Sequence, residues 1–269
     1  MTALILGLVA VALLAALAVL VGRRLAAAYR RDKAWAALSD KRQWVDRPFD
    51  ADLLEGLPAA ARRYFCFALR PGTPMRDIAV LATEHHRDGA RPVYAHAIVA
   101  APHGFLRRGY GGALRLPVSL TEGLVETRVL AESWLLRFVP CGRGTAPGAA
   151  AAAFERLAIE AALWTPAALL APAWRWQAVS DDVARVALEG AGLSATIELV
   201  VEAEGRLLAV RGTGEDAIVA QPATYIEQDG QRLPSTVEMR LAGACHRGDE
   251  RIRLMSVRFL EPWMGGSHN

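Results

Sequence analysis

Residues 193–202 read Leu-Ser-Ala-Thr-Ile-Glu-Leu-Val-Val-Glu. Every second residue from Leu193 to Val201 is apolar, and most of the residues between them are polar. Successive side chains of a β-strand point to opposite faces, so this period of two places the apolar side chains on one face. The stretch therefore predicts a strand with one face on a core and the other in solvent, as is common in antiparallel sheets.

Hairpin signals surround this strand. Glu204-Gly205 connects it to residues 206–212, and Asp229-Gly230 connects residues 224–228 to 232–241. Asp-Gly between two apolar runs is a strong signal for a tight hairpin. Further strands are predicted, on strand-like composition between Gly and Pro residues, at 76–84, 92–100, 104–110, 113–120, 123–130, 132–139 and 252–259.

Helical segments interrupt these strands. Residues 57–69, with Pro58 in the first turn, predict a short helix. Residues 147–164 form a strong helix by propensity that ends before Pro166, and a second helical piece is predicted at 167–171. The expected fold is α+β: a curved, mostly antiparallel, half-barrel-like sheet capped by helices and preceded by an N-terminal transmembrane helix.

The transmembrane helix is predicted from the N-terminal run. Every residue from Ala3 to Val21 is apolar or Gly, and such a helix spans about 28 Å, close to the hydrocarbon core of a bilayer. A cleavable signal peptide is the alternative. It is disfavoured because no Lys or Arg precedes the run and because the run exceeds the usual apolar region of about 7–15 residues.

A basic cluster follows this run: Arg23, Arg24, Arg30, Arg31 and Lys33. Such clusters mark the cytoplasmic side of a span. Only two lysines stand among the 31 basic residues and alanine is abundant, which indicates a GC-rich bacterial genome. We expect a single-pass protein of the bacterial inner (plasma) membrane, with residues 3–21 in the bilayer and the domain in the cytoplasm. A periplasmic domain whose basic stretch lies on lipid headgroups is the alternative.

The expected organisation has four parts. Residues 1–24 form the anchor, 25–50 a juxtamembrane helix and linker, 51–263 a single antiparallel-β domain with a helix insert near 147–171, and 264–269 a tail. The length of the third part suits one domain with one core.

Composition and motifs exclude several function classes. A net charge of +3, without a basic helix or an aromatic-interleaved basic patch, argues against a nucleic-acid partner. Cys66, Cys141 and Cys245 are far apart and lack a CxxC pattern, so we expect neither a metal site nor a disulfide framework, although a Cys141–Cys245 pair stays open. The loop 141–148 lacks the spacing of a phosphate-binding loop. No cofactor is expected.

The candidate site residues lie mainly on the predicted helix 147–164. Glu160 follows Arg156 by four residues, so the two side chains can meet on one helix face. A structural ion pair is the favoured interpretation, and a ligand-contacting acid is the alternative. Trp164 and Tyr225 are candidates for the lining of an apolar cavity, although large aromatic side chains more often fill cores.

Adjacent histidines form another candidate. His85 and His86 on one strand point to opposite faces and cannot both bind one metal ion without distortion. We interpret them as solvated side chains near a strand end.

The order of several motifs resembles a known family. These motifs are Leu57-Pro-Ala-Ala-Ala-Arg-Arg-Tyr-Phe, the helix from Phe154 to Leu170, Trp176 followed by Asp181-Asp182-Val-Ala-Arg, and Tyr225-Ile-Glu-Gln-Asp-Gly-Gln-Arg-Leu-Pro. Together they resemble the bacterial proteins grouped as domain of unknown function 6544, over about residues 55–240. The final strands are similar in style to the lipoprotein-carrier half-barrel. The resemblance implies a similar fold and a membrane anchor, but it supplies no catalytic residues, because the family has no assigned activity.

Three functions follow as hypotheses. The first is a non-enzymatic domain that binds a lipid or other apolar ligand beside the membrane, through Arg156, Glu160, Trp164 and Tyr225. The second is a hydrolase-like enzyme that acts on a membrane-derived substrate, with Glu160 as general acid or base. The third is a structural or protein-interaction module that uses an exposed sheet edge or apolar patch.

Overall fold

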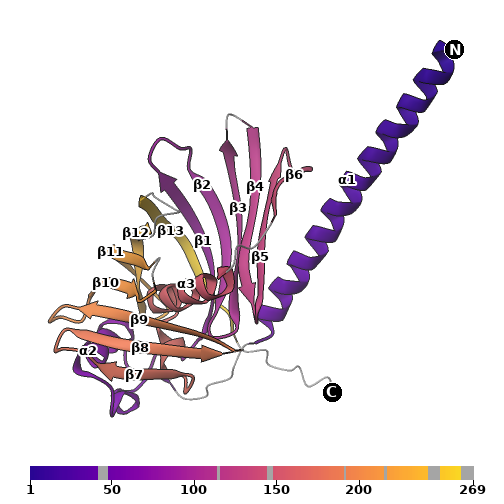
Figure 1. Cartoon of the computed structure of the whole chain (residues 1–269). Coiled ribbons are helices and arrows are strands. Elements are labelled where there is room, and N and C mark those ends of the chain that lie inside the picture. The colour runs from indigo at the N-terminus through magenta and orange to yellow at the C-terminus, as the bar shows by residue number, and fades with distance from the viewer. Residues whose placement is uncertain are drawn as a thin grey trace, which may run out of the picture.

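The computed structural model describes residues 1–41, 48–113, 116–143, 148–190, 192–214, 217–241 and 249–261. Within these residues, the strands form one antiparallel sheet in the order β6-β5-β4-β3-β2-β1-β13-β12-β11-β10-β9-β8-β7. The sheet curls into a half-barrel, and α3 lies across its hollow (Figure 1). The α+β class and the helix-capped half-barrel are therefore confirmed.

The element bounds are as follows. The strands are β1 (Ile78–Arg87), β2 (Val93–Ala100), β3 (Gly104–Ala113), β4 (Leu116–Val125), β5 (Arg128–Leu135), β6 (Val139–Arg143), β7 (Trp174–Ala178), β8 (Val183–Gly190), β9 (Leu193–Val201), β10 (Leu207–Gly212), β11 (Ile218–Gln228), β12 (Gln231–Leu241) and β13 (Asp249–Phe259). The helices are α1 (Thr2–Ser39), α2 (Ala59–Ala68) and α3 (Ala149–Trp164), with short 3-10 turns η1 (Ala51–Leu54) and η2 (Pro166–Leu170).

The main core fills the space between the concave face of the sheet and the helices. Phe65 of α2 and Phe154 and Trp164 of α3 are fully buried there. The Tyr64 hydroxyl donates a hydrogen bond to the Ala162 carbonyl (2.6 Å) and so joins the two helices. The alanine-rich sequence of α3 lets it approach the sheet closely, and Pro166 ends it as predicted, since proline cannot continue a helix.

Helix α1 runs without a break from the predicted membrane segment into the domain, over about 57 Å. Its last turns pack on the convex face of the sheet, where Leu38 joins a second small core with Ile98 and Leu106. Its N-terminal half projects away from the domain (Figure 1), and among the described residues this is the one helix long and apolar enough to cross a membrane.

Polar contacts fix the docked part of α1. Arg30 pairs with Glu132 at 2.9 Å, and Asp32 pairs with Arg108 at 3.1 Å. The guanidinium of Arg108 also stacks on the ring of Trp35, 4.5 Å from its centroid. A juxtamembrane helix was expected within residues 25–50, and α1 extends to Ser39.

Several strand boundaries differ from the sequence prediction. The breaks expected at residues 111–112 and 121–122 lie inside β3 and β4, and Gly123, expected to begin a strand, lies within β4. A Cβ at Gly123 would lie 2.5 Å from the Phe105 carbonyl oxygen, so close packing of the strands, and not a turn, requires glycine there. The true turn after β4 is at Glu126, which adopts φ of 57°. Residues 42–47 of the expected linker, and the predicted tail at 264–269, lie outside the described residues.

Candidate functional site

A cavity of about 200 Å³ opens on the concave face beside the first turns of α3. Strands β1 to β4, with β13, form its floor. Its charged wall consists of Arg87, Arg91, Arg107, Glu122, Arg156 and Glu250, joined by His85. Its other wall is small or apolar and includes Ala90, Val93, Ala95, Gly109 and Leu120. The cavity thus has a charged wall on one side and an apolar wall on the other.

Strand alternation decides which side chains reach this cavity. In β1, His85 shares the inward face with Leu81 and Thr83, whereas His86 points outward. The side chain of His85 is 6% exposed, and that of His86 is 46% exposed. The interpretation of both histidines as solvated is therefore wrong for His85, because the sheet curls over it.

The same alternation separates the two arginines of β3. Arg107 points inward and is 7% exposed, whereas Arg108 points outward to α1. Register then places Glu122 of β4 opposite Arg107, and Glu250 of β13 opposite Arg87. Directly opposed residues of antiparallel strands share a face, so these pairs meet above the concave surface.

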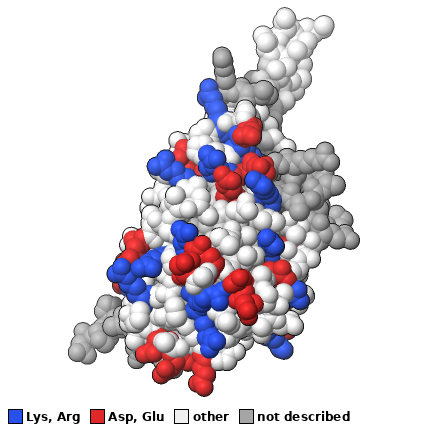
Figure 2. Space-filling model, turned by 90° about the vertical axis from the view of Figure 1, so that its left-hand side faces the viewer, with Lys and Arg blue, Asp and Glu red and all other residues white. Residues whose placement is uncertain are grey.

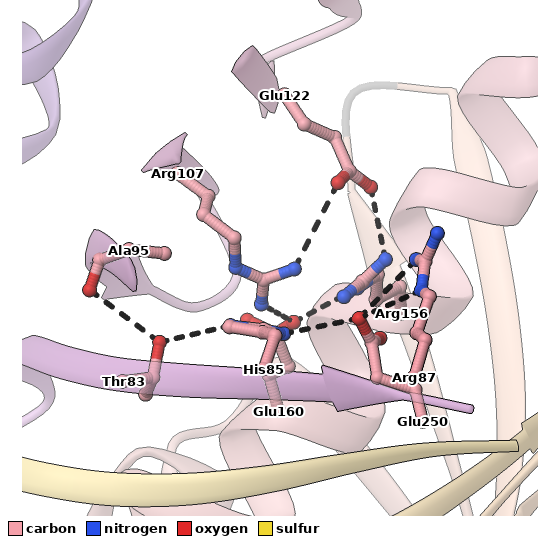
Figure 3. A network of polar contacts seen from close by, with 9 residues as sticks. All are labelled: Thr83, His85, Arg87, Ala95, Arg107, Glu122, Arg156, Glu160 and Glu250. Atoms are coloured by element: carbon pink, nitrogen blue, oxygen red, sulfur yellow. Dashed lines mark hydrogen bonds and ion pairs between the residues drawn. The ribbon is translucent and has the colours of Figure 1, made fainter. Parts of the chain in front are cut away.

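Two arginines and two carboxylates form the inner network (Figure 3). Glu160, which is fully buried, accepts hydrogen bonds from Arg107 and, at 2.9 Å, from Arg156. Glu122 lies 3.0 Å from Arg156 and 3.8 Å from Arg107. The predicted Arg156–Glu160 ion pair is confirmed, and it is one side of a four-membered cluster that the sequence did not reveal.

A second set of contacts surrounds His85. Its Nδ1 lies 3.2 Å from Glu250 Oε1, and its Nε2 lies 2.9 Å from the hydroxyl of Thr83. Burial, together with the charges of Arg107 and Arg156, lowers the pKa of His85 below its ordinary value despite the opposing Glu250. The neutral ring therefore donates from Nδ1 to Glu250 and accepts at Nε2 from Thr83.

The carboxylates of the site are held ionised. Burial would raise the pKa of Glu250, but the hydrogen bond from His85 and the charges of Arg156 and Arg87 bring it to about 2. Arg156, against the effect of burial, and then Arg107 lower the pKa of Glu122. Burial would lower the pKa of Arg156, and its three neighbouring carboxylates raise it instead. All these groups are charged at neutral pH.

The site keeps an excess of positive charge. Four arginines face three glutamates, Glu160 included, because the lowered pKa leaves His85 neutral. Arg107 Nε is buried without a hydrogen-bond partner, and Arg91 at the rim has no ion pair among the described residues. Such a wall suits an anion with two or more oxygen atoms, which guanidinium groups bind through paired hydrogen bonds.

An apolar strip leads from the cavity to the end of the sheet. Beyond Leu120 the concave face carries Leu116 and Val118 of β4, Leu135 of β5 and Val139 of β6, which we call the apolar strip. Leu116 and Val139 are 40% and 44% exposed. The strip extends the apolar wall of the cavity toward the turn between β5 and β6.

Trp164 and Tyr225 lie elsewhere. Trp164 is 1% exposed and donates from Nε1 to the Pro234 carbonyl at 3.3 Å. The Tyr225 hydroxyl donates to the Leu207 carbonyl at 3.2 Å, and its ring meets Phe67 edge to face. Neither residue lines the cavity, so a ligand contact for either one stays a prediction.

Other groups offer little chemistry. Glu160 supports Arg107 and Arg156 from behind and does not line the cavity. Cys66 and Cys141 are free and exposed. Cys245, and residues 144–147 of the loop 141–148, lie outside the described residues. In the described part of the chain, no three His, Cys, Asp or Glu side chains are placed to hold a metal ion.

Charges on the surface shown in Figure 2 are mixed. Blue and red side chains are interspersed over this face, without a broad area of one sign. Proteins that bind nucleic acid through the backbone present a basic stripe or patch. The face shown has none.

Comparisons with known proteins add the following. No curated protein matches the chain. A LolA superfamily protein from Nitrosomonas europaea resembles it in structure, with a TM-score of 0.40 and 9% identity, over 76% of this chain and 93% of that one. A DUF1329 family protein from Desulfovibrio piger gives a TM-score of 0.32 and 8% identity, over 71% and 88%. At these scores the two structures say nothing about what this chain binds.

The sequence itself matches a family model over residues 47–245, which is most of the chain and includes the strands and the helix that form the cavity. This protein belongs to the family of unknown function DUF6544.

Proposed function

We propose that the domain binds an anionic amphiphile, such as a fatty acid or an acidic lipid, next to a membrane. One observation carries the proposal: the cavity joins an arginine-rich wall to an apolar strip that runs out to the end of the sheet. A charged head and an acyl chain require these two surfaces side by side. The arginine-rich wall alone would equally suit a small inorganic anion, and the apolar strip alone would equally suit an uncharged hydrocarbon.

The size of the cavity limits what enters it. A pocket that encloses a whole drug-sized ligand has about 300–1,000 Å³. The cavity has about 200 Å³, which suits a headgroup such as a carboxylate or a phosphate. The acyl chain would then lie along the strip of Leu116, Val118, Leu135 and Val139, partly open to its surroundings.

Helix α1 supports a location at the membrane. All of the apolar run except Leu20 is exposed, and the same helix continues without a break into the segment that Arg30 and Asp32 tie to the sheet. Removal of the run as a signal peptide would cut a helix whose other half belongs to the fold. We therefore favour an uncleaved anchor in the bacterial inner membrane, with the domain on the cytoplasmic side that the basic cluster indicates.

The enzyme hypothesis has less support. A general acid or base must come within hydrogen-bond reach of the substrate. Glu160 is fully buried beneath Arg107 and Arg156 and is not part of the cavity wall. The position of Glu160 favours a role in holding the two arginines.

The test is native mass spectrometry of the full chain released from nanodiscs, combined with lipid extraction. We expect an anionic amphiphile at about one per chain. Arg91→Glu should remove most of it, because Arg91 lines the cavity. Arg91 is exposed, so the change should alter stability by only about 0.5 kcal/mol. Gly109→Leu should also remove it by filling the cavity, since a Cβ there would lie 3.2 Å from Val93.

Arg175→Glu is the matched control. Arg175 is 77% exposed and lies on the edge strand β7, whereas Arg91 lies in the β1–β2 connection, and the charge change is the same at both positions. Ligand occupancy should stay at the level of the unchanged protein. A protein that carries no amphiphile, or one whose occupancy ignores Arg91 and Gly109, would refute the proposal.

A further inference from the structure

We infer that the β5–β6 turn, taken as residues 136–138 together with Val139, the first residue of β6, is a second membrane contact that enters the bilayer surface beside the anchor. The inference rests on the proposed anchor and goes beyond it, because it assigns a lipid-binding role to a part of the β-domain. The turn reads Leu-Arg-Phe-Val.

The position of the turn follows from how α1 lies on the sheet. Leu38 packs at one end of the strands with Ile78 and Leu106, and further back along the helix Arg30 reaches Glu132 of β5. Arg24 then lies over the ring of Trp134, 5.2 Å from its centroid. The helix therefore runs along the convex face toward the β5–β6 turn, as Figure 1 shows.

Distances along the two elements place the turn at the level of the bilayer surface. The apolar run ends at Val21, three residues and about 4.5 Å of helix from Arg24. The turn begins at Leu136, two residues and about 7 Å of strand from Trp134. Arg24 and Trp134 are in contact, so the turn and the end of the apolar run are at nearly the same height.

The side chains of the turn suit a bilayer surface better than water. Leu136, Phe138 and Val139 are 46%, 49% and 44% exposed. Leu136 and Arg137 also adopt positive φ of 53° and 67°, a conformation in which hairpin turns usually carry Asn or Gly. Backbone strain and apolar exposure thus coincide at Leu136.

Charge around the turn identifies the surface it meets. Arg137 and Tyr110 lie close enough to Arg24 to shift its pKa through their charges. Arg23 precedes Arg24 on the side of the apolar run and adds a further positive charge. Basic side chains near a span are attracted to anionic lipid headgroups, and aromatic residues with a polar tip favour the interface. The occupant we propose is therefore the anionic leaflet that α1 crosses.

The contact would also connect the cavity to the bilayer. Val139 belongs to both the turn and the apolar strip, and Leu135 directly precedes the turn. With the turn in the headgroup layer, the outer end of the strip would touch the acyl chains. An amphiphile could then bind with its head in the cavity and its tail still in contact with the membrane.

The experiment uses the full chain with Cys66, Cys141 and Cys245 changed to Ser, and with one new cysteine that carries an environment-sensitive fluorophore. Phe138→Cys tests the turn, Leu13→Cys tests the anchor, and Val179→Cys in the exposed β7–β8 connection is the control. The proteins are reconstituted in phosphatidylglycerol-containing vesicles. Spin-labelled lipids then quench any fluorophore in the bilayer.

We expect strong quenching of the label at position 138 by lipids spin-labelled near the headgroup, at least threefold more than at position 179. The label at position 13 should be quenched by lipids spin-labelled deep in the acyl chains. Quenching at 13 with none at 138 would overturn the inference and leave the anchor intact. Absence of quenching at both positions would refute the anchor itself.

Discussion

Replacement of Glu160 by Gln should destabilise the domain strongly. The side chain of Glu160 is fully buried, and that of Arg107 beside it is 8% exposed. Loss of the carboxylate leaves Arg156 with Glu122 at 3.0 Å, but leaves Arg107 with Glu122 only at 3.8 Å. One buried cation thus loses its nearest counter-charge, and removal of one partner of a buried pair costs about 3–5 kcal/mol.

The matched control is Glu198→Gln. Glu198 pairs with Arg185 at 2.7 Å across β8 and β9, but these side chains are 22% and 41% exposed. Exposed pairs contribute about 0–1 kcal/mol, so the same chemical change should cost little there. Both variants replace a glutamate opposite an arginine, and they differ mainly in burial.

The assay is urea unfolding of the full chain in detergent micelles, followed by tryptophan fluorescence. We expect the midpoint to fall far more for Glu160→Gln than for Glu198→Gln, with similar slopes. The double change of Arg107 to Met and Glu160 to Met should recover most of the loss, because it removes both charges. Equal effects of the two single variants would refute the claim that the buried network, and not ion pairing in general, governs stability here.

Three further outcomes are expected. The pKa of Glu250 is about 2 in the folded chain, against an ordinary value of 4.5. Up to about 3 kcal/mol of stability should therefore be present above pH 4.5 and lost as the pH falls toward 2. In Glu250→Gln, the free energy of unfolding should fall less steeply with pH over this range than in the unchanged protein. Leu38→Ala should lower the free energy of unfolding by about 2–5 kcal/mol in thermal unfolding, because Leu38 is 1% exposed in the second core. A loss below about 1 kcal/mol would show that α1 is not part of the fold. Gly123→Ala should cost about 1–3 kcal/mol in urea unfolding through crowding with Phe105, whereas Gly7→Ala, which has open space around it, should be neutral.

The fold was largely predictable because its signals are local. The period of two in residues 193–202 and the Asp229-Gly230 turn led directly to β9 and to the β11–β12 hairpin. Helix α3 was predictable from alanine content and from the proline that ends it. The errors in strand boundaries arise because glycine serves two purposes, as a turn residue and as a residue that permits close packing. Gly111 and Gly123, each next to a predicted break, lie inside strands in close packing, whereas the turns at Glu126 and Leu136 have non-glycine residues at positive φ.

The site was less predictable because it depends on curvature and register. Two doublets, His85-His86 and Arg107-Arg108, each place one side chain inward and one outward, and the sequence shows the alternation but not which face will be covered. Glu250 joins His85 across the β1–β13 pairing, 165 residues away in the chain. Only the Arg156–Glu160 pair, which lies on one helix, had a short-range signal.

The cost of the buried network bears on its role. Replacement of a buried ion network by well-packed apolar side chains is often neutral or stabilising. Stability alone therefore does not account for the four charged groups between α3 and the sheet. Their arrangement has a different consequence: Glu160 fixes Arg107 and Arg156 from beneath, while Glu122 holds them from the side. The two guanidinium groups are then fixed in place before a ligand arrives, which spares the entropy of ordering two long side chains during binding. A fixed pair of arginines beside an apolar strip is the arrangement that an anionic amphiphile requires.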